Sequence, residues 1–284
     1  KDYLKAKLYL FENLIKERGN VITDQMIPEF KKIKKIKLDK KLKLNTLNDK
    51  KNNFEVISHS FRGESQFIKI KYNNSTRDIE LNLIGKIQLK NVLMSIIAAR
   101  NSDIKLERIL NIIPKLRPVE GRFEKIGKIK NLSRVILDYA HTPDALKTCL
   151  LNLKEQFPNK KIIVLFGCGG NRDQNKRSKM GKIASNYSDK IILTTDNPRF
   201  ESPEKIKRDI KKGIKKDRKW RPMHPKSTPG GPKRDLCGHL GAQWGAHWGH
   251  MWGISAPRWL QVSICSAKSD DLERSMLVDV GQCW

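Results

Sequence analysis

The chain has few cysteines for its length and lacks a long apolar run. Its 284 residues include five scattered cysteines, none in a Cys-x-x-Cys pair. An odd number without metal-binding spacing argues against a zinc site or a disulfide framework and favours a reducing compartment. No run of about 18 apolar residues occurs, and the charged N-terminus lacks the apolar region of a signal peptide. We therefore expect a cytoplasmic protein without a membrane span.

Acidic residues are also scarce, with 30 Asp and Glu against 58 Lys and Arg, so the formal net charge is +28. Such a charge is typical of proteins that bind nucleic acids, and a basic nucleic-acid-binding module is one interpretation. The basic residues are not gathered in one patch, however, and lysine supplies most of them. Arginine is the usual residue for phosphate recognition. We favour a solvated lysine-rich surface and expect no nucleic-acid partner.

Tryptophan is absent before Trp220, and all six tryptophans lie from there onward. A tract from Gly238 to Gly253 repeats Trp-Gly with interspersed histidines. His247 and His250 have a spacing that can suit a metal on a helix, but the surrounding glycines disfavour that helix. We expect residues 217–284 to be an unstructured or aberrant tail, frameshifted or chimeric.

Two α/β segments precede this tail. In residues 1–116 we expect helices over 2–18, 91–100 and 106–116, and strands over 21–23, 54–60, 67–72 and 79–83. The lysine-rich run 31–43 could be a loop or a strand. In residues 117–216 strands over 135–137, 161–166 and 190–194 alternate with helices over 143–155, 176–187 and 203–216. This alternation predicts a doubly wound, Rossmann-like parallel sheet. Thr142-Pro143 and Ser202-Pro203 are suited to begin helices.

A polar motif follows each predicted strand of the second segment. The motifs are Asp138-Tyr-Ala-His-Thr-Pro-Asp144, Phe166-Gly-Cys-Gly-Gly-Asn-Arg-Asp173 and Asp196-Asn-Pro-Arg199. The carboxyl ends of strands in an open parallel sheet form a ligand crevice. We therefore expect the three motifs to converge on one site.

These motifs resemble those of the last domain of the Mur ligase family. Further similar segments occur in family order, at Tyr3–Phe11, at Leu83–Gly85 with Asn91, and at Gly121–Glu124. The resemblance implies the end of a central ATP-binding domain over 1–116 and an incomplete amino-acid-binding domain over 117–216. It also implies ATP-dependent ligation of meso-diaminopimelate to UDP-N-acetylmuramoyl-L-alanyl-D-glutamate in peptidoglycan synthesis, through an acyl phosphate. We expect a monomer.

The resemblance assigns roles to nine residues. Lys7 would be carbamylated and bind Mg²⁺, which prefers oxygen ligands. Asn91, Arg122, Asp138 and His141 would contact ATP. The diaminopimelate would be bound by Arg172, Asp196, Asn197 and Arg199.

Simpler roles remain open for several of these residues. Lys7 could be one more surface lysine, and Asp138 could cap the turn that follows it. His141 could be an ordinary loop residue, Arg122 could pair with a neighbouring glutamate, and Asn197-Pro198 could form only a turn. A ligase of the same family that adds lysine or glutamate is a further alternative, although Asp-Asn-Pro-Arg favours diaminopimelate.

Two family motifs are not found in these 284 residues. They are the ATP loop Gly-Thr-x-Gly-Lys-Thr and the closing segment Gly-Lys-Gly-His-Glu. We therefore expect the polypeptide by itself to show no ligase turnover.

Overall fold

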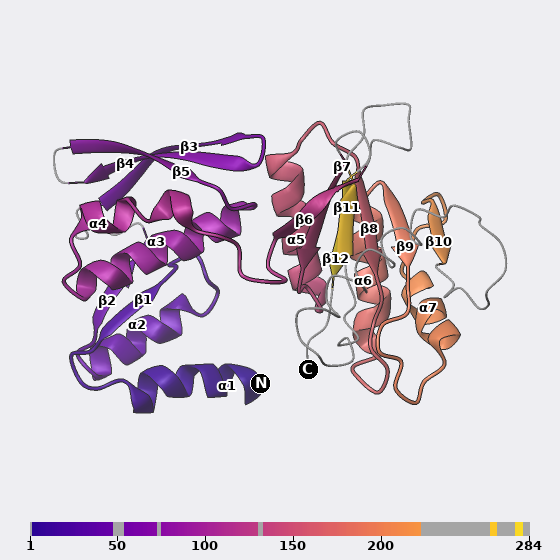
Figure 1. The fold of residues 1–284 in the computed structure, drawn as a ribbon. Coiled ribbons are helices and arrows are strands. Elements are labelled where there is room, and N and C mark those ends of the chain that lie inside the picture. The colour runs from indigo at the N-terminus through magenta and orange to yellow at the C-terminus, as the bar shows by residue number, and fades with distance from the viewer. Residues whose placement is uncertain are drawn as a thin grey trace, which may run out of the picture. The chain divides into compact units, whose positions relative to one another are not determined.

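The computed structural model describes residues 2–47, 54–72, 75–129 and 133–222, together with the backbone of strands at 262–265 and 276–280. The chain forms two compact units, Lys1–Pro118 and Val119–Trp284 (Figure 1). Both mix helices and strands, as the sequence predicts. None of the helices in the described ranges has the length and apolar composition needed to span a bilayer.

The first helix of the chain is shorter than predicted. Helix α1 (Asp2–Tyr9) continues as a π-helix over Leu10–Leu14 and stops there. The prediction of a helix to residue 18 was wrong, because Ile15 is already extended and Arg18 has a φ of 58°. The Lys40 ammonium donates to the Glu12 carbonyl at 2.9 Å and to the Ile15 carbonyl at 2.6 Å. A lysine in this position satisfies carbonyls that a helix end leaves without partners.

The prediction of a loop or a strand for the lysine-rich run 31–43 was wrong, because most of this run forms a helix, α2 (Phe30–Asp39). Ile33 and Ile36 are its buried residues, and most of its lysines are exposed. That spacing places the apolar side chains on one helical face. Helix α2 connects β1 (Asn20–Thr23) to β2 (Lys43–Thr46), which pair in parallel. A parallel pair requires such a crossover connection.

An antiparallel sheet and two helices enclose the larger core of the first unit. The sheet comprises β3 (Phe54–Arg62), β4 (Ser65–Tyr72) and β5 (Ser75–Leu81). Buried residues of β4 and β5 pack with those of α3 (Lys86–Asn101) and α4 (Leu106–Leu110). The predicted helix 106–116 is α4 followed by a separate 3₁₀ turn, Ile113–Lys115. Pro114 has no N–H to continue the α-helix.

The second unit contains a mainly parallel sheet in the order β10-β9-β8-β12-β7-β6. The parallel strands are β7 (Ser133–Asp138), β8 (Ile162–Phe166), β9 (Lys190–Leu193), β10 (Trp220–Pro222) and β12 (Met276–Val280). Strand β6 (Glu124–Ile129) is antiparallel to β7. All five residues of β8 are buried, as expected for a strand inside a parallel sheet.

Three helices connect these strands: α5 (Pro143–Gln156), α6 (Asn175–Tyr187) and α7 (Pro203–Lys211). The Thr142 hydroxyl accepts from the Ala145 amide at 3.3 Å, which confirms the predicted cap of α5. Helix α7 also begins where predicted, with Ser202 as its N-cap residue and Pro203 in its first turn, although the Ser202 side chain makes no capping hydrogen bond. Helix α7 ends earlier than predicted, before Gly213. A Cβ on Gly213 would lie 1.8 Å from the Ser178 carbonyl oxygen, so glycine permits this close approach to α6.

Three strands come from the stretch that we predicted to be aberrant: β10, β12 and β11 (Val262–Cys265), which pairs with β12. Strand β12 lies between β7 and β8 (Figure 1). The strands that carry the first two motifs, β7 and β8, are therefore separated by one strand in the sheet. The Trp/His tract lies outside the described residues, and the origin of the tail stays a prediction.

Candidate functional site

Seven of the nine predicted site residues lie in the second unit. Arg122 directly precedes the segment that leads into β6, and the other six lie at or after the ends of β7, β8 and β9. We name the segments that follow these strands the first loop (139–142), the second loop (167–174) and the third loop (194–202). Because the three strands are parallel, all three loops lie at the carboxyl ends of the strands, on the same side of the sheet.

Asp138, the last residue of β7, is 6% exposed. Its carboxylate accepts from the backbone amides of Phe123, at 3.1 Å, and Ala140, at 3.0 Å. Burial raises its pKa from 3.8 to about 6, although the two amides and the nearby Arg122 charge oppose this shift. The bond with Ala140 is the local cap of the following turn that the sequence analysis gives as the alternative role of Asp138. The bond with Phe123 also holds the segment before β6 against the end of β7. A direct contact with a ligand stays a prediction.

Arg122, Tyr139 and His141 gather beside Asp138. The Arg122 guanidinium lies 4.3 Å from the centroid of the Tyr139 ring. The Tyr139 and His141 rings are 4.8 Å apart at an interplanar angle of 60°. Tyr139 was not among the predicted site residues, although it stands inside the first motif. Two rings and a guanidinium form a surface suited to a flat, electron-rich group.

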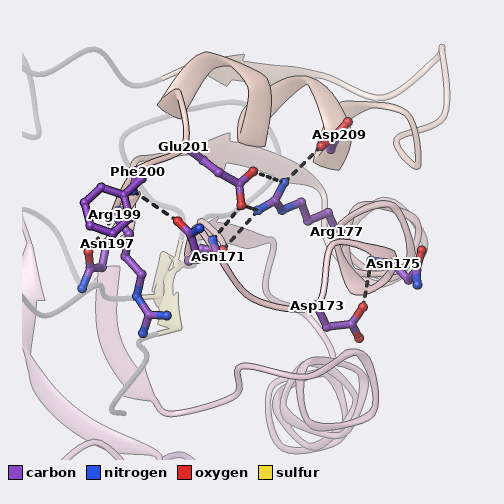
Figure 2. Close-up of polar contacts among 10 residues, drawn as sticks. Asn171, Asp173, Asn175, Arg177, Asn197, Arg199, Phe200, Glu201 and Asp209 are labelled. Carbon is purple, nitrogen blue, oxygen red and sulfur yellow. Dashed lines mark hydrogen bonds and ion pairs between the residues drawn. The ribbon is translucent and has the colours of Figure 1, made fainter.

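The second and third loops are joined directly. The Gly170 amide donates to the Asn197 carbonyl at 2.9 Å, and the Phe200 amide donates to the Asn171 side-chain oxygen at 3.2 Å (Figure 2). A Cβ on Gly170 would lie 1.8 Å from the Pro198 carbonyl oxygen, so this approach requires glycine. The exposed Arg172 and Arg199 therefore stand on adjoining loops.

Asp196 is the third residue of the third loop and is 5% exposed. Its carboxylate accepts from the Asn197 amide at 2.6 Å. Burial raises the pKa of Asp196, whereas the Asn197 amide and the charges of Lys176 and Arg199 lower it. The Asn197 side-chain oxygen accepts from the Arg199 amide at 3.3 Å. The turn interpretation of Asn197 is thus observed, while the Arg199 side chain is left exposed.

Lys176 is a buried site residue that the sequence analysis missed. It lies in the first turn of α6, and its ammonium donates to the His141 carbonyl at 3.1 Å. Its charge also lowers the pKa of Asp196 in the third loop. The sequence signal for this role is the position of Lys176, three residues after Asp173 of the second motif. Lysine is so common in this chain that the signal is weak.

Three segments of the site hold a residue in a left-handed conformation. The φ angles are 48° for Phe123, 51° for Asn171 and 50° for Arg199. Asparagine tolerates this region, but the conformation is unfavourable for phenylalanine and arginine. Strained residues of this kind cluster at functional sites, which supports the location of the site.

The remaining predicted residues, Lys7 and Asn91, lie in the first unit. Lys7 has an exposed side chain on α1. Asn91 is exposed on α3, and its amide donates to the Gln88 side chain at 3.3 Å. Within the described ranges, no three His, Cys, Asp or Glu residues are grouped so that they could hold a metal. The roles of Lys7 and Asn91 stay predictions.

The sequence matches two family descriptions in succession. Residues 1–99 match "Mur ligase middle domain", and residues 121–225 match "Mur ligase, glutamate ligase domain". The chain belongs to the Mur ligase family. The three loops lie within the second of these Mur ligase domains.

Named Mur ligase relatives share much of this chain. The UDP-N-acetylmuramoyl-L-alanyl-D-glutamate–2,6-diaminopimelate ligase of Rickettsia typhi is 35% identical over 214 residues, which cover 75% of this chain and 42% of the relative. A solved structure with the same ligase name is 28% identical, with a TM-score of 0.51, and covers 78% of this chain and 46% of its own.

A Mur ligase structure solved with a nucleotide shows the same fold. The MurF ligase of Thermotoga maritima in complex with ADP has a TM-score of 0.57 at 17% identity, over 77% of this chain and 47% of its own. The chain spans less than half the length of these relatives.

Proposed function

We propose that the chain is part of an ATP-dependent ligase that joins meso-diaminopimelate to UDP-N-acetylmuramoyl-L-alanyl-D-glutamate in peptidoglycan synthesis. The observation that carries this proposal is the joining of the second and third loops by the Gly170–Asn197 hydrogen bond. It brings the loops that carry two exposed guanidinium groups together beside a buried carboxylate. The name of the Rickettsia typhi relative, which covers most of this chain, agrees with it.

The chemistry of the paired loops fits an amino acid with two carboxylates. Arg199 can bind one carboxylate through two parallel hydrogen bonds, and Arg172 offers a second guanidinium. Asp196 and Asn197 supply oxygens that can accept from an ammonium group. Lysine has one carboxylate and would leave one arginine unused, so this set of residues favours diaminopimelate over lysine.

The cluster of Arg122, Tyr139 and His141 fits the base and ribose of ATP, with Asn91 as a further contact implied by the family. ATP, when bound, supplies the phosphoryl group that activates the dipeptide carboxylate. Lys176 holds a positive charge between the first and third loops, where it can offset phosphate charge. The described residues do not by themselves make a magnesium site, because Lys7 is the sole predicted ligand among them.

Calorimetric titration of the 284-residue chain with meso-diaminopimelate and L-lysine tests the proposal. We expect diaminopimelate to bind at least tenfold more tightly, because its second carboxylate makes a charged hydrogen-bonded contact that contributes about 1.4 kcal/mol or more. The Arg199→Ala variant should reduce this preference. Tighter binding of lysine would support the lysine-adding alternative, and equal binding of both amino acids would contradict the assignment of Arg172 and Arg199.

A further inference from the structure

A buried arginine outside the predicted site joins the second and third loops. Arg177, in the first turn of α6, has no exposed surface. Its two terminal nitrogens donate to the two carboxylate oxygens of Glu201, each at 2.9 Å (Figure 2). One of them also donates to the Gly169 carbonyl at 3.3 Å, and the other to the Asp209 carboxylate at 3.1 Å. Arg177 therefore contacts the second loop, the third loop and α7 at once.

Glu201 completes the connection from the third loop. Its Oε1 atom, which accepts from Nη2 of Arg177, also accepts from the Asn171 amide at 2.6 Å. The Asn171 side-chain oxygen in turn accepts from the Phe200 amide at 3.2 Å. We call Arg177, Glu201 and Asn171 the loop clamp. Apart from the bond between Arg177 and Asp209, these hydrogen bonds join the two loops to each other or join a loop to α6.

The geometry requires arginine at position 177. Its guanidinium donates to four acceptor oxygens through its two terminal nitrogens. A lysine ammonium has three donors without a planar fork and cannot reproduce the paired contact with Glu201. The contact with Arg177 lowers the pKa of Glu201 to about 2, so the pair stays ionised at neutral pH.

The clamp residues adjoin the residues that face the ligand. Asn171 directly precedes Arg172, and Glu201 stands two positions after Arg199. A shift of either clamp residue would change the spacing between the two exposed guanidinium groups. Binding of two carboxylates on one molecule depends on that spacing.

We propose that Arg177 is a positioning residue, which fixes the second loop against the third so that Arg172 and Arg199 bind one dicarboxylic amino acid together. The ligand in this inference rests on the proposed function. The coupling of the two loops rests only on the contacts of the clamp.

The test compares Glu201→Gln and Arg177→Lys with Glu204→Gln in the full chain. Glu204 is the matched control because it lies on α7 and pairs with Lys207 at 3.3 Å on the same helix. Amide hydrogen exchange at Gly170, Asn171 and Phe200 measures the coupling of the loops. Titration with meso-diaminopimelate measures the consequence for binding. We expect both clamp variants to speed exchange and weaken binding by tenfold or more, and the control to change neither.

Unchanged exchange at these amides in folded Glu201→Gln would overturn the inference. So would faster exchange with unaltered diaminopimelate affinity, because the loops would then move without affecting the ligand. Glu201→Gln keeps the size of the side chain, so it remains informative if Arg177→Lys does not fold. If the unsubstituted chain binds no diaminopimelate, the proposed function fails together with the ligand part of the inference, while hydrogen exchange still decides the coupling.

Discussion

At the scale of single residues, the site uses a backbone conformation that most side chains avoid. Arg199 has a φ of 50°, which is about 1 kcal/mol less favourable for a residue with a Cβ than for glycine. We therefore expect Arg199→Gly to be more stable to urea than Arg199→Ala by about 1 kcal/mol. This is the reverse of the usual order, because in a helix or strand a glycine variant is ordinarily less stable than the alanine variant. Both variants should lose diaminopimelate binding equally, and a more stable alanine variant would contradict the left-handed conformation.

The buried Asp138 should make stability depend on pH. Its pKa is about 6 in the folded chain and 3.8 as the reference value, so the folded state binds the proton more tightly. The contribution of Asp138 to the free energy of unfolding is therefore complete below pH 3.8 and is lost as the pH rises through about 6. The Asp138→Asn variant does not titrate at this position. Compared with it, the unsubstituted chain should become less stable as the pH rises from 3.8 to about 6. Urea denaturation at several pH values measures the difference, and a constant difference would refute the shift.

The sequence was informative about residues in the loops and less so about those that support them. Asp196, Asn197 and Arg199 could be found because they stand in a short polar motif directly after an apolar strand. Lys176 and Arg177 lie in a helix of ordinary composition, and their roles depend on contacts with distant residues such as Glu201. No local pattern encodes such contacts.

At the scale of elements, the site depends on two loops that approach closely. A methyl group on Gly170 would collide with the Pro198 carbonyl, whereas a Cβ on Gly127 of β6 meets nothing within 4 Å. We expect Gly170→Ala to destabilise the chain by about 1–3 kcal/mol through overpacking and to weaken diaminopimelate binding. Gly127→Ala should change stability by less than about 1 kcal/mol. Thermal unfolding of the two variants checks this, and equal melting temperatures would contradict the loop geometry.

Elements with clear periodicity were predicted well. Strands β7, β8 and β9 and helices α5 and α6 match their predicted ranges closely, because apolar runs and turn residues mark them. Helix α2 was not predicted, since two buried isoleucines among many lysines give a weak pattern. The place of β12 between β7 and β8 depends on pairing with strands far away in the sequence, which local patterns cannot show.

At the scale of the whole molecule, we expect the 284 residues alone to release no phosphate from ATP in the presence of the dipeptide substrate and meso-diaminopimelate. The sequence contains no Gly-Lys-Thr loop to hold the phosphates. A phosphate-release assay, with the Rickettsia typhi relative as the positive control, measures this. Turnover that depends on diaminopimelate would contradict the expectation and would require another phosphate-binding segment.

The central claim is that the second and third loops together form a binding site for a dicarboxylic amino acid. The most direct test is an NMR titration of the ¹⁵N-labelled chain with meso-diaminopimelate. We predict saturable shifts of the Arg172, Asn197 and Arg199 amides with one shared affinity, and no shifts in strands β3 to β5. Absence of shifts in these loops, or shifts confined to other parts of the chain, would contradict the claim.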